Sequence, residues 1–355
     1  MKVGKVQFIV AIIIMFFSFF LVIVSYYNFQ LSAVNPADSE DIIIEVPKGT
    51  TVKGIGKILH KEGFIRDEFI FNVYVKLNNV TNLQAGYYKL SKNMSLPEII
   101  EKIKSGDAVF PDMIKITFPE GFNLEQIAAR VSEHTINQKE DFMRIATDKE
   151  YIDELIDKYW FLTSEIKNKN IRHALEGYLF PSTYYFENNK VTPKVIIEKM
   201  LDQMDFILSK YKEEISASKY SLHEILTLAS IIEYEAIFEE DRYMISGVFY
   251  NRLNNNMKFE SCVTACYAAE VDGACTPEKV NTIKEYEHPY NTYQVTGFPP
   301  GPINMPGESV IHAALNPASH DYFFFMADIY DTQQTFYSKT LDEHEEKVNK
   351  YLKNR

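Results

Sequence analysis

The residues from 221 to 235 have the apolar spacing of a helix. One stripe of this helix contains positions four, three and four residues apart: Leu222, Leu226, Ala229 and Glu233. The next stripe is its polar side: His223, Thr227, Ser230 and Tyr234. Glu233 therefore continues an apolar stripe, where its carboxyl loses hydration. Such a loss raises the pKa of a carboxyl toward the range in which it donates a proton near neutral pH.

A second carboxylate near the end of this helix, Glu235, lies on a different stripe with Glu224, Leu228 and Ile231. The structural alternative for both glutamates is a helix-end carboxylate that faces solvent or pairs with a cation. Arg242 is the nearest cation in sequence. Because structural carboxylates outnumber catalytic ones, periodicity alone favours this alternative.

A run of apolar residues from 8 to 27 predicts a membrane helix, because at about 1.5 Å per residue it spans about 30 Å of hydrocarbon. Lys2 and Lys5 precede the run, and the next cation is Lys48. By the positive-inside rule, residues 1–7 form a cytoplasmic tail and the remainder of the chain lies outside. The alternative is a cleaved signal peptide, whose apolar core is only about 7 to 15 residues long. No small-residue cleavage site directly follows the run, which favours an uncleaved anchor in the cell membrane.

Past a spacer at residues 28–40, the pattern predicts a small α+β module at residues 41–107. Its expected order is strand, helix, helix, strand and helix, at 42–46, 52–62, 67–77, 85–88 and 95–106. The last helix begins with a Ser N-cap that is soon followed by Pro. The module contains no catalytic constellation, so we expect it to bind a ligand or to pack against its neighbour.

The remaining residues, 108–355, are expected to form a larger mixed domain, which makes the whole chain an α+β protein. Its main expected elements lie at 114–118, 123–134, 241–253, 309–315, 322–327 and 334–337, with a charged helix at the end. Lys- and Glu-rich stretches before residue 170 predict solvated helices on the outside of the fold. The chain around its three cysteines lacks periodicity and is expected to be irregular.

Three segments outside the Glu233 helix are candidates for the walls or loops of a site. Residues 119–121 read Pro-Glu-Gly, and residues 176–184 combine a carboxylate, a glycine and several aromatic residues. We expect both segments to line a cleft. Residues 296–303 are rich in Gly and Pro, which predicts a rigid loop with little conformational freedom to lose on binding. A packed structural turn or loop is the alternative for each.

Composition narrows the choice of partners. The formal net charge of -12 argues against a nucleic-acid partner, because phosphate contacts need clustered Lys and Arg. The 23 Tyr and 25 Phe suit stacking on sugar rings and equally suit a protein core. The eight His form no ligand-spaced cluster and the cysteines lack C-x-x-C spacing, so we expect no metal site and no cofactor. Outside the cytoplasm two of the three cysteines can pair, and the sequence does not decide between Cys262, Cys266 and Cys275.

An ordered series of motifs resembles those of the endolytic murein transglycosylase family (MltG, YceG-like). The motifs lie at 119–121, 176–181, 228–233, 248–253, 290–293 and 296–303. The resemblance extends from the membrane anchor to the C-terminus. It implies a membrane-anchored enzyme with a LysM-like module at 41–107 and a catalytic domain at 108–355. Such an enzyme cleaves the glycan strands of peptidoglycan internally.

The resemblance also implies roles for single residues. Glu233 matches the catalytic glutamate, which protonates the oxygen between MurNAc and GlcNAc and then takes the proton of the MurNAc C6 hydroxyl. The product is a 1,6-anhydro-MurNAc end, and elongation of the strand stops. The residues expected to bind substrate are Glu235, Glu176, Tyr290, Asn291, Tyr293 and Thr296. The implied partners are peptidoglycan strands and the membrane. The membrane helix would also hold the enzyme near the proteins of a cell-wall synthesis complex.

The chain departs from the family pattern after the 248–253 motif. Where the family has a segment resembling Leu-Gln-Ser-Asp-Pro-Thr, residues 259–264 read Phe-Glu-Ser-Cys-Val-Thr. Cys262 and Val263 thus replace an Asp-Pro pair, and a disulfide from Cys262 is expected to take over its structural role. The departure supports a second hypothesis, a catalytically inactive, membrane-tethered scaffold that binds peptidoglycan. A third is a muramidase that uses water and leaves a reducing end.

Overall fold

The computed structural model of the chain describes residues 2–106, 113–271, 273, 275–328 and 331–353. The chain divides into two compact units, residues 1–111 and 112–355, and each has its own hydrophobic core. The predicted α+β class is confirmed, since both units combine helices with two-stranded antiparallel sheets. The predicted boundary between residues 107 and 108 lies outside the described residues, and the predicted division into domains stays a prediction.

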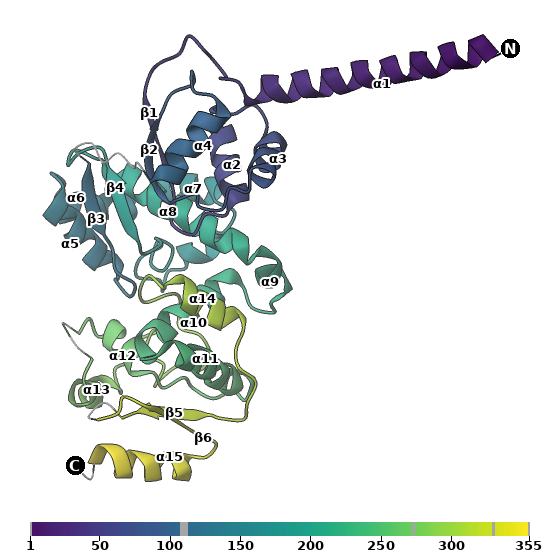
Figure 1. The fold of residues 1–355 in the computed structure, drawn as a ribbon. Coiled ribbons are helices and arrows are strands. Elements are labelled where there is room, and N and C mark those ends of the chain that lie inside the picture. Colours follow the sequence, from purple (N-terminus) through teal and green to yellow (C-terminus); the bar gives the residue numbers. More distant parts are fainter. Residues whose placement is uncertain (1, 107–112, 272, 274, 329–330, 354–355) are drawn as a thin grey trace. The chain divides into compact units, whose positions relative to one another are not determined.

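The chain begins with a long apolar helix, α1 (Lys2–Leu31), which contains the predicted run at 8–27 (Figure 1). Its segment Ile12–Leu31 has a mean hydropathy of 2.1 and is not buried against the rest of the chain. By length and composition this segment is able to cross a membrane, and a signal sequence meets the same criteria. The direction of insertion, with residues 1–7 in the cytoplasm, stays a prediction.

The small module has the predicted order of strands and helices. It consists of β1 (Ile42–Val46), α2 (Val52–Lys61), α3 (Glu68–Leu77), β2 (Gly86–Leu90) and α4 (Leu96–Ser105). β1 and β2 pair antiparallel, and apolar side chains of the strands and helices form one core. The side chains of Thr51 and Asp67 cap α2 and α3, and Ser95 forms a capping box with Glu98 at the start of α4. These polar caps explain why the helix starts are readable from the sequence.

In the larger unit, two strands that are distant in sequence form one antiparallel pair. β3 (Ile114–Thr117) pairs with β4 (Thr183–Phe186), so the 119–121 loop and the segment before β4 leave the same end of the pair. The amide of Phe118 extends the pairing by donating to the carbonyl of Ser182 at 2.9 Å. The helical elements of this half are α5 (Leu124–His134), α6 (Lys139–Ala146), α7 (Lys149–Lys158), the 3-10 turn η1 (Ser164–Lys167), α8 (Pro193–Lys210) and α9 (Lys212–Ala217).

The Lys and Glu residues of the helices before residue 170 face solvent as predicted, and each helix also buries one face. α6 buries Phe142 and Ala146, and α7 buries Tyr151 and Leu155. In both helices the buried residues lie four positions apart, which places them on one face. The many Lys and Glu residues cover the other face and hide this short apolar pattern.

The second half of the larger unit surrounds α10 (Leu222–Glu235). Its other elements are α11 (Glu239–Asn254), α12 (Cys262–Ala268), α13 (Pro277–Ile283), α14 (Glu308–Leu315), β5 (Phe324–Ala327), β6 (Thr335–Ser338), α15 (Leu341–Val348) and the π-helical turn η2 (Asn349–Lys353). β5 and β6 correspond to the elements expected at 322–327 and 334–337, and they pair antiparallel. The expected irregular chain around the cysteines is wrong, because α12 and α13 lie there. Each is seven residues long, too short for periodicity to reveal.

Three of the four residues on the predicted polar side of α10 are buried and the fourth, Tyr234, is exposed, which corrects the amphipathic interpretation. His223 is 8% exposed, and Thr227 and Ser230 are 0% exposed. The Thr227 hydroxyl donates to the carbonyl of His223 at 2.7 Å, and the Ser230 hydroxyl donates to the carbonyl of Thr227 at 2.7 Å. Hydroxyls that bond to their own helix can be buried without an unpaired donor. α10 is thus the central helix of this half, with α11 and α14 packed against it.

Candidate active site

The C-terminal end of α10 lies against two loops that are far apart in sequence. One loop, residues 119–122, connects β3 to α5, and the other, residues 302–307, precedes α14. The amide of Gly121 donates to the carbonyl of Met305 at 2.9 Å, and the amide of Met305 donates to the carbonyl of Phe122 at 2.8 Å. This reciprocal pair of backbone hydrogen bonds joins the two loops.

Groups on α10 hold both loops in place. The hydroxyl of Tyr234 donates to the carbonyl of Gly121. The hydroxyl of Ser230 accepts from the amide of Ile303 at 3.0 Å, and the carbonyl of Ser230 accepts from Nδ2 of Asn304 at 2.7 Å. Ser230 and Asn304 are 0% exposed, so water does not compete for these bonds. The loops therefore have a fixed position relative to the end of the helix.

The turn at Glu176 and Gly177 packs on the same 302–307 loop. Gly177 has a φ of +83°, and a Cβ there would lie 2.3 Å from Cβ of Pro302. Its amide donates to Sδ of Met305 at 3.1 Å. Both the backbone conformation and the close approach require glycine at this position.

Glu233 is half-buried between these loops, and its Oε2 accepts a hydrogen bond from the amide of Gly307 at 2.9 Å. Burial raises the pKa of this carboxyl, and the neighbouring Glu120 carboxylate also raises it. The Gly307 amide and the charge of Arg242 act in the opposite direction without reversing the shift. A pKa above the ordinary value is what a carboxyl needs to donate a proton near neutral pH.

Arg242, the cation nearest to Glu233 in sequence, directs its Nη1 to the hydroxyl of Ser309 at the start of α14. Arg242 acts on Glu233 through its charge. The hydrogen bond to Oε2 of Glu233 comes instead from the backbone amide of Gly307. The environment of Glu233 thus differs from the solvent-facing or ion-paired carboxylate of the structural alternative.

Glu235 points into different surroundings, because residues two positions apart lie on opposite sides of a helix. Its Oε1 accepts from the hydroxyl of Ser261 at 2.6 Å. Burial raises the pKa of Glu235, while Ser261 and the charge of Arg252 oppose the rise. Arg252 forms an ion pair with Glu260 at 3.1 Å, so Glu235 lies beside a structural network of the loop that follows α11.

Glu176 is 1% exposed and holds the start of α5. Its Oε1 accepts from the amide of Leu124, the first residue of α5, at 2.8 Å, and its Oε2 accepts from the hydroxyl of Tyr267 at 3.3 Å. Burial raises the pKa of Glu176 to about 8, although both hydrogen bonds lower it. Because the 119–122 loop leads directly into α5, Glu176 helps to fix the loop that reaches Glu233.

The 290–293 segment is largely internal. Tyr290 and Asn291 are 0% exposed. Nδ2 of Asn291 donates to three carbonyls: those of Ile283, Lys284 and Tyr286. Tyr293 is half-buried and Thr296 is exposed. The predicted binding roles of these residues stay predictions, and the burial of Tyr290 and Asn291 favours a role in shaping the loop.

The cysteine pairing differs from the expected one. Cys266 and Cys275 form a disulfide, and Cys262 is a free thiol whose Sγ lies 3.2 Å from the hydroxyl of Tyr293. Cys262 therefore does not replace the missing Asp by a disulfide. The bridge instead ties α12 to the segment before α13.

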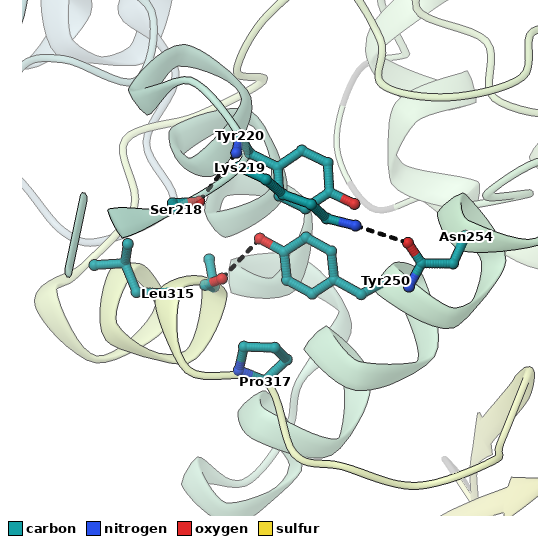
Figure 2. Close-up of a pocket in the computed structure, with 8 residues that line it drawn as sticks. Ser218, Lys219, Tyr220, Tyr250, Asn254, Leu315 and Pro317 are labelled. Carbon is teal, nitrogen blue, oxygen red and sulfur yellow. Dashed lines mark hydrogen bonds between the residues drawn. The ribbon is translucent and has the colours of Figure 1, made fainter. Parts of the chain in front are cut away.

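A cavity of about 240 Å³ lies at the opposite end of α10 from Glu233 (Figure 2). It is lined by the residues that precede α10 and by parts of α11 and α14: Ser218, Lys219, Tyr220, Tyr250, Asn254, Ala314, Leu315 and Pro317. The Tyr250 hydroxyl and the Lys219 ammonium already donate to Ala314 and Asn254, respectively. Neither of the predicted cleft walls lines this cavity, so it is separate from the Glu233 site.

Within the residues that the structure describes, no three His, Cys, Asp or Glu side chains gather so as to hold a metal ion. The groups described around Glu233 are the Glu120 carboxylate, the Gly307 amide and the Arg242 guanidinium. Sequence reasoning missed two of these residues, Glu120 and Gly307. Glu120 belongs to a motif noted above, while the role of Gly307 has no sequence signal.

Comparison with known proteins agrees with the resemblance found in the sequence. A model of the YceG-like family matches residues 44–350. A Bacillus subtilis (strain 168) protein named endolytic murein transglycosylase is 37% identical over 336 residues, which are 94% of this chain and 91% of the relative. A Streptococcus pneumoniae (D39) protein of the same name is 33% identical over 92% of this chain. The match covers 62% of that relative's length.

The likeness extends to three dimensions. The crystal structure of a putative yceG-like protein from Listeria monocytogenes matches with a TM-score of 0.62 and 40% sequence identity. The match covers 86% of this chain and 99% of the crystallised one. Because the family model and a relative each cover most of its length, this chain belongs to the YceG-like family.

Proposed function

We propose that this protein is a lytic transglycosylase, a lyase that cleaves the bond between MurNAc and GlcNAc within peptidoglycan strands. The observation that carries the proposal is the environment of Glu233. This carboxyl has a raised pKa and lies between two loops whose motifs resemble those of the family. Two relatives that match 94% and 92% of this chain are named endolytic murein transglycosylase, which supports the same reaction here.

In the proposed mechanism, Glu233 acts first as an acid and then as a base. Its proton passes to the glycosidic oxygen as the bond from the anomeric carbon to that oxygen breaks. The resulting carboxylate then takes the proton of the MurNAc C6 hydroxyl, whose oxygen bonds to the anomeric carbon. The products are a GlcNAc hydroxyl and a 1,6-anhydro-MurNAc end. Glu233 is restored, and no water is consumed.

The other predicted site residues support this chemistry in two ways. We propose that Thr296 and Tyr293, which retain exposed surface, contact sugar hydroxyls or N-acetyl groups. Glu176, Tyr290 and Asn291 are buried and would act by holding the loops around the substrate. Glu235 would position the end of α10 through its hydrogen bond with Ser261. That Glu235 also contacts substrate stays a prediction.

The setting of the reaction is part of the proposal. α1 would anchor the protein in the cell membrane with the catalytic unit outside, and the Cys266–Cys275 disulfide suits an oxidising compartment. The module predicted at residues 41–107, which contains β1, α2, α3, β2 and α4, would be the LysM-like part and would bind glycan. Held at the membrane, the enzyme would cut nascent strands, end their elongation and lie near a cell-wall synthesis complex.

The test is product analysis with the full-length protein in detergent. Purified peptidoglycan strands are digested with the wild type, with Glu233→Gln and with Glu150→Gln, an exposed position on α7 that serves as a charge-matched control. Mass spectrometry should find anhydro-MurNAc ends with the wild type and the control but not with Glu233→Gln. Reducing ends would support the muramidase hypothesis. Intact strands from a protein that still binds them would support the scaffold hypothesis.

A further inference from the structure

Glu120 lies against Gly307, the residue whose amide binds the Glu233 carboxylate. A Cβ on Gly307 would lie 2.2 Å from Oε1 and 2.3 Å from Cδ of Glu120. The amide of the same glycine donates to Oε2 of Glu233 at 2.9 Å. Two carboxyl groups, one from the loop before α5 and one from α10, therefore meet at one glycine.

The backbone next to Glu120 is fixed on the Glu233 side. Gly121 has a φ of +79°, and a Cβ there would lie 3.1 Å from Cε1 of Tyr234 and 3.8 Å from Cγ of Glu233. Its amide and its carbonyl are both engaged, with Met305 and Tyr234, respectively. The contact of Glu120 with Gly307 is thus set by the same bonds that hold the loop to α10.

Two charges act on Glu233, and they come from two different elements. Glu120 contributes a negative charge from the 119–122 loop, and Arg242 contributes a positive charge from α11. On α10 itself, Tyr234 has its pKa raised to about 12, chiefly by burial, so its hydroxyl is neutral. At the start of α14, the Glu308 carboxylate is paired with Lys210 at 3.0 Å.

We propose that Glu120 is a positioning residue of this active site: seated on Gly307, it places a second negative charge beside Glu233 and thereby keeps Glu233 in its proton-bearing form until substrate is bound. The inference rests on the proposed function and deepens it. When two carboxyls are neighbours, ionisation of one disfavours ionisation of the other. Glu120 is exposed and Glu233 is half-buried, and burial together with the Glu120 carboxylate raises the pKa of Glu233, which favours the proton on Glu233.

The same arrangement serves both halves of the reaction. Before cleavage it keeps Glu233 protonated at a pH where an ordinary glutamate is ionised. After the proton has passed to the leaving oxygen, the repulsion between two carboxylates makes Glu233 a stronger base for the C6 hydroxyl proton. Glycine at position 307 is required because any side chain there would occupy the place of the Glu120 carboxyl.

The test is the pH profile of kcat/KM for strand cleavage by the full-length protein in detergent. An acid catalyst must be protonated, so activity falls as pH rises through its pKa. Removing the negative charge with Glu120→Gln lowers the pKa of Glu233, and the alkaline fall should move down by about 0.5 to 1 pH unit. The control Glu150→Gln removes the same charge from the exposed surface of α7 and should leave the profile unchanged.

Gly307→Ala gives a second, independent variant. The φ of Gly307 is -76°, which alanine adopts readily, and the amide that binds Glu233 remains. The new methyl group would displace the flexible end of Glu120, so the alkaline limb should move in the same direction as with Glu120→Gln. High salt screens an exposed charge, and it should bring the wild-type profile toward that of Glu120→Gln.

The outcomes separate this inference from the proposed function. If the wild type makes no anhydro ends, the proposed function fails. A second outcome is that the wild type makes anhydro ends, Glu233→Gln makes none, and the pH profile of Glu120→Gln coincides with that of the wild type. This outcome overturns only the role of Glu120. Loss of Glu120→Gln activity at every pH would also overturn it, because Glu120 would then be catalytic itself, as the second carboxylate of a hydrolase.

Discussion

Glu233 and Glu235 are two positions apart on α10, and burial raises the pKa of both, yet their surroundings differ in kind. Glu233 meets a backbone amide and lies near another carboxylate. Glu235 meets the Ser261 hydroxyl beside the ion pair of Arg252 and Glu260. A raised pKa is therefore not what distinguishes an acid catalyst from a structural carboxyl. The difference lies in whether the neighbouring groups bind the carboxyl into the fold or leave its proton available.

The largest expected effect comes from exchanging the two carboxyls for amides. Glu233→Gln should lower kcat by about 10³-fold, because it removes the proton that the leaving oxygen needs. Glu235→Gln should cost about tenfold or less, since its amide oxygen still accepts from Ser261. Steady-state rates on glycan strands measure both. Equal losses, with both variants folded by circular dichroism, would contradict the distinction drawn here.

The next effect concerns Glu176, a buried carboxyl with a positioning role. Burial raises its pKa from the ordinary 4.5 to about 8 in the folded chain, so the folded state binds the proton more tightly than the unfolded state. The free energy of unfolding should therefore fall as pH rises from about 4.5 to 8, by at most about 1.4 kcal/mol per pH unit. Glu176→Gln cannot ionise and should lose this slope in denaturant unfolding at several pH values. An unchanged slope would show that Glu176 is not the group responsible.

The smallest effect is expected at Cys262, whose thiol is free and contacts Tyr293. Cys262→Ser keeps a polar group of similar shape, so cleavage should change by less than about twofold. Thiol titration of the unfolded wild type without reductant should find a single free thiol, and none in the variant. A large loss of cleavage in Cys262→Ser would mean that this departure from the family pattern affects the site directly.

The sequence predicts best where one local signal determines the structure. Capping signals such as Ser95 and Asn123 mark helix starts that the structure confirms. Glu233 stands out because it continues an apolar stripe of α10. Alternating apolar positions likewise reveal β3, whose residues read Ile-Lys-Ile-Thr.

Contacts between distant segments carry no such signal. The meeting of Glu120 with Gly307 depends on the bonds of Gly121 to Met305 and to Tyr234, which join three separate segments. The burial of Ser230 is hidden for the same reason, because its partners Ile303 and Asn304 lie far along the chain. α12 escapes prediction because it is only seven residues long and its partners, such as Glu176 for Tyr267 and Thr292 for Thr264, lie far away in the sequence.

The central claim is that Glu233 transfers its proton to and from the substrate without water. Digestion of glycan strands by the full-length protein in water enriched in heavy oxygen tests this claim most directly. We expect anhydro-MurNAc ends that carry no heavy oxygen from the wild type, and no such ends from Glu233→Gln. Heavy oxygen at the new reducing end of the cleaved strand would contradict the claim, because water would then be the nucleophile.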